Sequence, residues 1–146
     1  MQSVRELIAH KGSTVHSVSV SGTVLEAARV MNDARVGALV VLDEGAMVGI
    51  LSERDILTRV VAAERDPSRT LVSQVMTREV LTCAPETRIG EARHVMRERR
   101  VRHLPVVDQG QLLGMLSIGD LNLVENETLV ETIRHMEAYI SGGASL

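Results

Sequence analysis

Residues 36–55 read VGALVVLDEGAMVGILSERD, and residues 101–120 read VRHLPVVDQGQLLGMLSIGD. Each stretch holds two short apolar runs joined by Asp-x-Gly, a turn sequence typical of a β-hairpin, and ends in a polar cluster. The alignment extends backwards without a gap to Glu26 and Glu91, and fourteen of the thirty positions from 26 to 55 are identical to their counterparts at 91–120. The chain therefore contains two copies of one supersecondary unit.

Each copy has a helical pattern ahead of its hairpin. Apolar residues recur at helical spacing over residues 24–31 in the first copy and 89–96 in the second. Short β-prone stretches at 18–20 and 80–83 precede these patterns, and a further helix is expected after each polar cluster. Each copy is therefore predicted to fold as strand, helix, strand, strand, helix.

The predicted fold class is α+β, with helices and strands mixed within two β-α-β-β-α repeats. The first repeat spans residues 1–69 and includes an N-terminal flanking helix at 4–10; the second spans 70–146 and includes a C-terminal flanking helix at 126–140. A unit of about 55 residues would be only marginally stable alone, because it buries little of its surface. We therefore expect the repeats to pack around a pseudo-twofold axis, which would create clefts in symmetric pairs.

The composition excludes several classes of protein. A formal net charge of −3 argues against a nucleic-acid-binding protein, and Tyr139 is the only aromatic residue available for stacking on bases. Cys83 is the only cysteine, so an internal disulfide is excluded, and the histidine spacing does not indicate a metal site. The N-terminal sequence lacks the apolar run of a signal peptide or a membrane span. We expect a cytoplasmic protein that contacts neither membranes nor nucleic acid.

The polar clusters Ser52-Glu53-Arg54-Asp55 and Ser117-Ile118-Gly119-Asp120 allow two interpretations. Each lies where a strand ends and a helix begins, a place where free backbone N–H groups and the helix dipole favour an anion. A carboxylate at the fourth position of the cluster could also accept both hydroxyls of a ribose. Ser-x-x-Asp is equally a capping pair that stabilises the helix start. The two roles are compatible.

The duplicated pattern resembles a tandem pair of CBS domains, the arrangement called a Bateman module. The resemblance rests on Gly49-Ile50-Leu51-Ser52-Glu53-Arg54-Asp55, on Gly114-Met115-Leu116-Ser117-Ile118-Gly119-Asp120, and on His103-Leu104-Pro105-Val106-Val107-Asp108, which is typical of a second repeat. It covers roughly residues 10–125. The resemblance implies a regulatory domain that binds adenine nucleotides such as AMP, ADP, ATP or NAD, or S-adenosylmethionine, in clefts between the repeats, and that forms a homodimer.

The resemblance also implies which residues line the two clefts. Asp55 and Asp120 would bind ribose, Ser52 and Ser117 would lie near ribose or phosphate, and Ile50 and Met115 would line the adenine pocket. The cleft containing Asp120 would comprise Asp120, Ser117, Met115, His103, Gly37, Val36, His16 and Lys11. The cleft containing Asp55 would comprise Asp55, Ser52, Arg54, Ile50, Ala38, Arg102, Val101, Leu81 and Met76. Because Ala38 stands where the second repeat has His103, the Asp55 cleft is expected to bind phosphate more weakly unless Arg54 or Arg102 compensates.

The sequence favours a noncatalytic sensor of adenine nucleotides that acts on an unidentified regulated protein. It contains no hydrolase motif, P-loop or zinc-protease motif, so neither an enzyme nor a catalytic cofactor is expected. The alternative is a structural dimerisation module with vestigial clefts, because the tail places Leu129, Ile133, Met136 and Ile140 at helical spacing. An arginine patch at 93–102 is interpreted mainly as a solvated helix face, apart from Arg102 beside the cleft.

Overall fold

The computed structural model describes residues 2–145 and the side chains of residues 2–141. In the first copy, a three-stranded sheet is formed by β1 (Ser17–Ser19), β2 (Ala38–Asp43) and β3 (Ala46–Ser52). β1 pairs in parallel with β2, and β2 pairs antiparallel with β3. Helix α2 (Val24–Ala34) connects β1 to β2, and β3 leads into α3 (Glu53–Ile56) and the π-helical segment η1 (Leu57–Val61).

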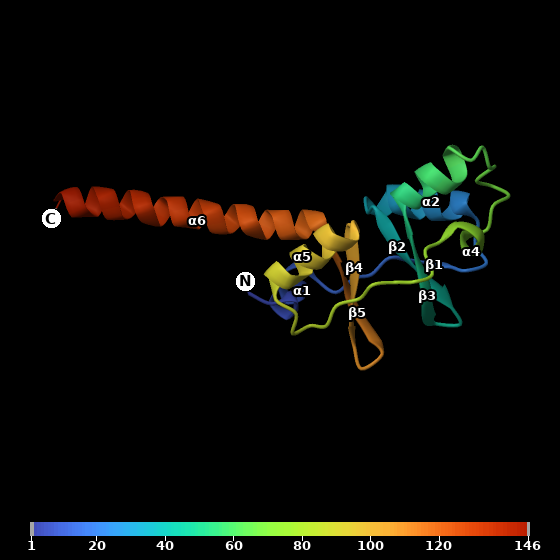
Figure 1. Ribbon diagram of the computed structural model, residues 1–146, viewed down its shortest axis with the longest axis horizontal. Coiled ribbons are helices and arrows are strands. Elements are labelled where there is room, and N and C mark those ends of the chain that lie inside the picture. Colours follow the sequence, from blue (N-terminus) through green and yellow to red (C-terminus); the bar gives the residue numbers. More distant parts are fainter. Residues whose placement is uncertain (1, 146) are drawn as a thin grey trace.

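The second copy repeats this arrangement with one strand fewer. Helix α5 (Ile89–Arg99) precedes an antiparallel pair, β4 (His103–Asp108) and β5 (Gln111–Ser117), and α6 (Ile118–Ser145) follows. The β-prone stretch at 80–83 does not form a strand; only Cys83 makes a single parallel bridge, to Val106. The residues just before Cys83 cross from one half of the molecule to the other, so they cannot lie along β4 (Figure 1).

The two hairpins are close structural copies. Each has a two-residue turn with positive φ at both positions, 49° and 82° at Glu44 and Gly45, and 48° and 76° at Gln109 and Gly110. These angles match a type I′ turn, whose twist suits a hairpin. The strand register also shifts at equivalent places, between Val41 and Leu42 and between residues 106 and 107. The predicted duplication is therefore confirmed in backbone geometry as well as in sequence.

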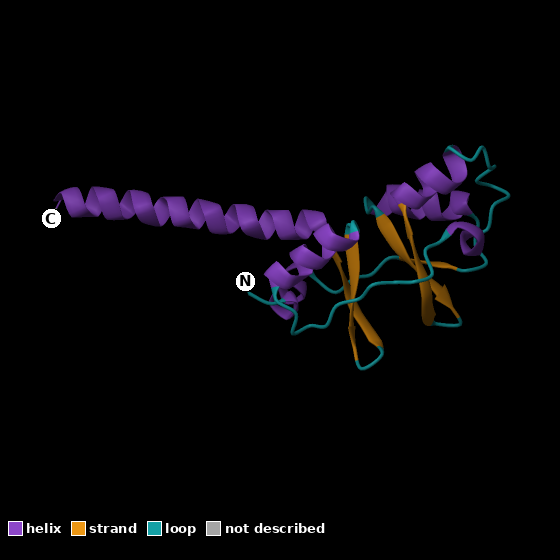
Figure 2. Cartoon of the chain, viewed as in Figure 1, coloured by secondary structure: helices purple, strands orange, loops and turns teal. Residues whose placement is uncertain are grey.

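Two hydrophobic cores lie side by side, each between a sheet and its helices (Figure 2). Helix α1 (Val4–Lys11) is at the start of the chain but packs in the second core, where Val4 and Leu7 are buried. Helix α4 (Val72–Val75) follows the first copy and packs in the first core, where Val72 and Val75 are buried. The halves expected from the sequence, 1–69 and 70–146, thus exchange their leading helices.

Helix α6 is longer than the sequence indicated. The segment at 126–140 is not a separate flanking helix but continues without interruption from the helix that begins after Ser117. Its first turns are held to the body by Leu121 and Val124, which are buried in the second core. The rest projects away from the body as a single rod (Figure 1). No helix of residues 2–145 is both long enough and apolar enough to cross a bilayer.

Candidate functional site

The two Ser-x-x-Asp clusters both act as helix caps. The Ser52 backbone N–H donates to Asp55 Oδ2 at 3.0 Å, and the Asp55 N–H donates to Ser52 Oγ at 3.2 Å. The equivalent distances at Ser117 and Asp120 are 2.9 and 3.1 Å. The capping interpretation is therefore correct for both copies. Each cap holds its carboxylate at the end of a strand. Capping does not exclude the second interpretation, in which the same carboxylate also binds a ligand.

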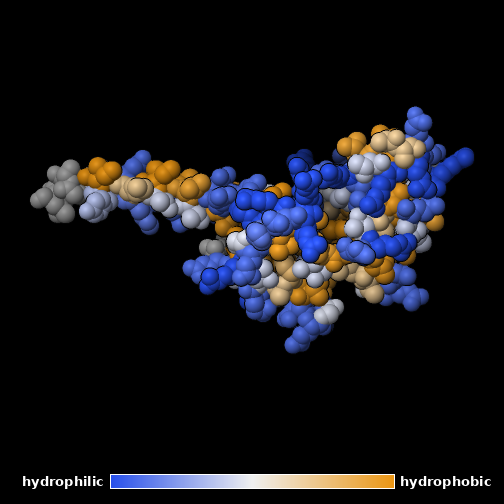
Figure 3. Space-filling view, in the orientation of Figure 1, coloured by the Kyte–Doolittle hydropathy of each residue, from blue (hydrophilic) through white to orange (hydrophobic). Residues whose placement is uncertain are grey.

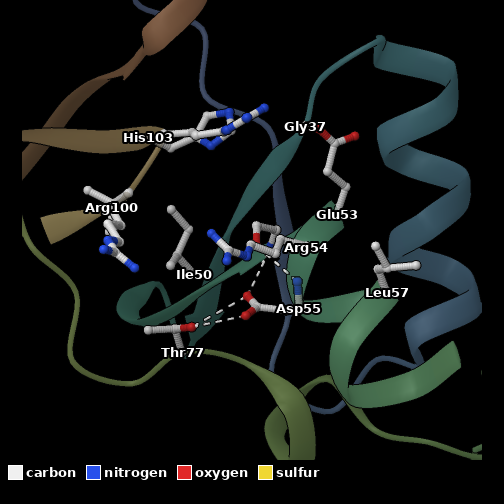
Figure 4. A pocket seen from close by; sticks show the side chains of 12 residues that line it. Gly37, Ile50, Glu53, Arg54, Asp55, Leu57, Thr77, Arg100 and His103 are labelled. Carbon is white, nitrogen blue, oxygen red and sulfur yellow. Dashed lines mark hydrogen bonds between the residues drawn. The ribbon is translucent and has the colours of Figure 1, made fainter. Parts of the chain in front are cut away.

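Asp55 is the most buried charged group of the described residues, with 8% of its surface exposed. The Thr77 hydroxyl donates to Asp55 Oδ1 at 3.3 Å, as Figure 4 shows, and the Arg59 guanidinium lies 4.0 Å from the same oxygen. Thr77 is held in place by a two-way backbone bridge, because the Ile50 N–H donates to the Thr77 carbonyl and the Thr77 N–H donates to the Ile50 carbonyl. The segment after α4 therefore forms one wall beside the Asp55 carboxylate.

A cavity of about 840 Å³ opens in front of Asp55, between the two repeats. The first repeat contributes Asp55, Ser52 and Ile50 to its lining. The second contributes residues 100–103, at the end of α5 and the start of β4, and Figure 4 shows Arg100 and His103 across the cavity from Asp55. This volume is in the range of small-molecule sites. Neither repeat could form the cavity without the other.

Basic groups surround this cavity. Arg54, Arg100, Arg102 and His103 all line it, against the acidic groups of Asp55 and Glu53. Burial lowers the pKa of His103, although the Glu53 and Asp120 carboxylates oppose that effect, so the imidazole is neutral near pH 7. The three guanidinium groups can form paired hydrogen bonds to phosphate oxygens. The cavity thus combines a carboxylate floor with cationic walls.

The Asp120 carboxylate has a different partner. The Lys11 ammonium donates to Asp120 Oδ2 at 2.6 Å and to the Met115 carbonyl at 2.7 Å. The two side chains are 29% and 23% exposed, so the ion pair is only partly shielded from solvent. Burial raises the pKa of Asp120, but hydrogen bonds from Lys11 and from the Ser117 N–H outweigh burial and hold the pKa below its usual value. Asp120 is therefore ionised and already paired.

The structure places most of the residues predicted for the Asp55 cleft around the cavity: Asp55, Ser52, Arg54, Ile50, Arg102 and Val101. Three predicted residues lie elsewhere. Ala38 and Met76 are buried, and Met76 packs in the first core because its side chain lies beneath Gly49. Leu81 packs against the second core. None of the three is among the residues that line the cavity.

The residues predicted for the Asp120 cleft lie in several places. Ser117, Met115 and Lys11 do contact one another or Asp120. Gly37 and His103 line the Asp55 cavity, and a Cβ on Gly37 would lie 3.4 Å from the His103 ring. The charge of Asp120 also acts on His103 and raises its pKa. Val36 lines a neighbouring hollow of about 570 Å³ between α2 and α3. His16 lies just before β1, where its backbone carbonyl accepts a hydrogen bond from the Val40 N–H.

Four residues of the cavity were not predicted from the sequence: Glu53, Leu57, Thr77 and Arg100. Thr77 is the neighbour of the predicted Met76, and only the bridge to Ile50 determines which of the two side chains faces the cavity. Arg100 ends α5 in the left-handed conformation with φ of 54°, which turns the chain towards the other repeat. Its counterpart Arg35 has a φ of 56°, so the duplicated arginine was an available signal.

Comparison with known proteins identifies the family. The family model described as the CBS domain matches residues 4–62 and 72–125. The chain belongs to the CBS-domain family. CBS-domain proteins are generally regulatory modules that bind adenosine-containing ligands and form oligomers, and members built from CBS domains alone are typically noncatalytic.

Individual relatives agree over most of the chain. The CBS domain-containing protein YhcV of Bacillus subtilis is 37% identical over 130 residues, which cover 88% of this chain and 90% of YhcV. The mitochondrial CBS domain-containing protein CBSX3 of Arabidopsis thaliana is 37% identical over 126 residues, 83% of this chain and 61% of CBSX3. The crystal structure of the CBS domain NE2398 matches with a TM-score of 0.80 at 35% identity, over 86% of this chain and 97% of that one. The chain thus spans somewhat less than two thirds of the plant relative.

Proposed function

We propose that this protein is a noncatalytic sensor that binds an adenine nucleotide, AMP, ADP, ATP or NAD, in the cavity in front of Asp55. One observation carries the proposal: a single inter-repeat cavity brings a buried carboxylate together with Arg54, Arg100, Arg102 and His103. A carboxylate can accept hydrogen bonds from both hydroxyls of a ribose, and clustered guanidinium groups suit the phosphates attached to it. Ile50 offers an aliphatic surface to the base.

The position of the cavity explains how binding would be signalled. Asp55 belongs to one repeat and residues 100–103 to the other, so a bound nucleotide would link the two cores. A ligand shifts a conformational equilibrium only by its different affinity for the two states. A nucleotide that bridges Asp55 and Arg102 favours the arrangement in which the repeats are close. The regulated protein would recognise that arrangement.

The test is calorimetric titration with AMP, ADP, ATP and NAD of the wild type and of Asp55→Asn. Asparagine preserves the size of the side chain and an oxygen for the Ser52 N–H, but it removes the charge. We expect affinity to fall at least tenfold, which corresponds to about 1.4 kcal/mol. Asp43→Asn, at the exposed end of β2, is the matched control and should bind as the wild type does. If none of the four nucleotides binds the wild type, the proposal is wrong.

A second candidate function, homodimerisation, is favoured by the projecting part of α6. Leu129, Ile133, Met136 and Ile140 are each more than half exposed, and their alternating spacing of four and three positions puts them on one face. Figure 3 shows apolar side chains along this rod, far from either core. A seam with heptad-like spacing suits pairing with the same seam of a second copy.

Truncation after Asn126 tests this candidate. The last residue of α6 buried in the second core is Val124, so the shortened chain keeps both cores intact. We expect sedimentation to show a shift from dimer to monomer, while nucleotide binding is unchanged. A truncated chain that remains dimeric would exclude the tail as the main contact.

A further inference from the structure

We infer that the two clefts are not equivalent: Lys11 acts as an internal cation that closes the Asp120 cleft, so the chain binds one nucleotide, at Asp55. This inference rests on the proposed function, because it concerns which of two duplicated carboxylates is free to bind a ribose. It is based on a comparison of two hydrogen-bond donors: Lys11, which donates to Asp120, and Thr77, which donates to Asp55 in the other copy.

The gapless alignment of the two copies makes the comparison direct. Asp55 corresponds to Asp120, Ile50 to Met115, and, at the same offset, Thr77 to Gly12. In the first cleft the Thr77 backbone N–H donates to the Ile50 carbonyl at 2.9 Å, and the Thr77 hydroxyl donates to Asp55 at 3.3 Å. Gly12 has no side chain to repeat the second of these contacts.

Lys11 makes both contacts with one ammonium group. Its Nζ donates to the Met115 carbonyl at 2.7 Å and to Asp120 Oδ2 at 2.6 Å. The same two acceptors, a strand carbonyl and a capping carboxylate, are therefore satisfied in both copies. In the first copy the donors are an amide and a hydroxyl, and in the second copy the donor is a cation.

Helix length explains why the lysine reaches this place. Helix α4 ends at Val75, so the residues after it are extended and Thr77 can bridge to Ile50. Helix α1 continues through Lys11 and ends at Gly12, whose φ of 102° suits a glycine. The role of Met76, packing beneath a strand glycine, is taken in the second copy by Ile8, which lies beneath Gly114. Lys11 is thereby free to extend into the cleft.

The consequences for a ribose differ between the clefts. At Asp55 the nearest guanidinium, that of Arg59, lies 4.0 Å from the carboxylate, and the close donors are neutral. At Asp120 a hydroxyl would have to displace an ammonium at 2.6 Å. Hydrogen bonds between two charged groups are stronger than those from a neutral hydroxyl, so the ammonium prevails. Removing one partner of a partly shielded ion pair also costs more free energy than removing one partner of an exposed pair, because the remaining charge is less well solvated.

Calorimetric titration with AMP tests the inference by stoichiometry. The wild type should bind one AMP per chain, and Asp120→Asn should leave that stoichiometry unchanged. Lys11→Met keeps an unbranched side chain of similar length but removes the charge, so it should raise the stoichiometry to two. Adding Asp120→Asn to Lys11→Met should restore a stoichiometry of one. Adding Asp55→Asn to Lys11→Met should leave one site, the opened Asp120 cleft.

Each outcome decides a different question. Two AMP molecules per wild-type chain, or one per Lys11→Met chain with its affinity unchanged, would overturn the role given to Lys11. Weaker binding in Lys11→Met would also overturn it, because Lys11 would then be a ligand-binding residue. If neither protein binds AMP, the proposed function itself fails. Should Lys11→Met unfold, Asp120→Asn in the wild type remains decisive: a change in the number of AMP molecules bound per chain contradicts the inference.

Discussion

At the scale of single residues, His103 is the group in the cavity whose charge responds to pH near neutrality. The carboxylates of Glu53 and Asp120 act to raise the pKa of the ring, and the cations Lys11 and Arg102 act to lower it. Burial dominates and lowers the pKa of His103 below its usual value of 6.5. An anionic phosphate placed beside the ring would favour the protonated form and raise that pKa. Nucleotide binding should therefore be coupled to the uptake of a proton.

This coupling predicts that AMP affinity changes with pH in a way that depends on His103. Because the pKa is low in the free protein and higher in the complex, affinity should increase as the pH falls from 7.5 to 6.0. Over this pH range, we expect the AMP affinity of the wild type to increase about threefold more than that of His103→Gln. Calorimetry in buffers of different ionisation enthalpy measures both the affinity and the proton uptake. The phosphate group of AMP titrates in the same range, and the comparison between the two proteins cancels its contribution. Parallel pH profiles would show that the phosphate is not beside His103.

The sequence predicted the residues of the cavity that belong to a repeated motif. Asp55 and Ser52 were found because they recur in the second copy as Asp120 and Ser117, and the structure places both first-copy residues on the cavity wall. Thr77 was missed, and Met76 was chosen in its place. The choice between two adjacent side chains depends on the bridge from Thr77 to Ile50, a contact between separate segments of the chain that periodicity does not encode.

At the scale of elements, two glycines let a neighbouring segment approach a strand closely. A Cβ on Gly49 would lie 2.7 Å from Met76 Sδ and 2.8 Å from the Thr77 backbone carbonyl. A Cβ on Gly114 would lie 2.8 Å from Ile8 Cδ1, the flexible end of a side chain. The equivalent glycines therefore differ in what an added methyl group would displace.

We predict that Gly49→Ala destabilises the protein more than Gly114→Ala does. The first substitution must move the backbone that carries Thr77, at a cost of about 2–3 kcal/mol, whereas the second can be relieved by a rotamer change at Ile8, at about 1 kcal/mol or less. Urea unfolding measures both values. Gly49→Ala should also weaken AMP binding, since it shifts Thr77 relative to Asp55. Equal losses of stability would mean that the segment after α4 is not held as closely as the structure indicates.

Local sequence determined the two hairpin turns and the start of helix α2. The turns at 44–45 and 109–110 follow from Asp-x-Gly, and α2 begins at the capping box of Thr23 and Glu26. The interrupted strand at 80–83 and the uninterrupted α6 were not predicted. The first depends on distant structure, because the chain crosses between the cores there. The second follows from local sequence, because no proline lies between the cap at Ser117 and the tail.

At the scale of the whole molecule, the exchange of leading helices ties the two halves of the chain together. α1 contributes Val4 and Leu7 to the second core, while the residues after the linker at 65–69 contribute Val72 and Val75 to the first. The duplication in the sequence predicted two units that pack together. The order of elements along the chain, however, does not determine in which core a helix at the start of a unit packs. Only the packing shows that α1 and α4 have changed places.

This exchange predicts how the protein behaves when its chain is cut. A protease site inserted at residues 65–69, where every residue is exposed, would yield two fragments that each hold one helix in the other's core. Each buried Val or Leu side chain of those helices contributes about 1.5–3 kcal/mol, so the cut protein should elute as one species in size-exclusion chromatography and separate only in denaturant. A combined Val4→Asp and Val72→Asp variant, cut at the same site, should separate in buffer alone because both exchanged helices would be expelled. Separation of the cut wild-type protein in buffer would show that the exchanged helices do not hold the repeats together.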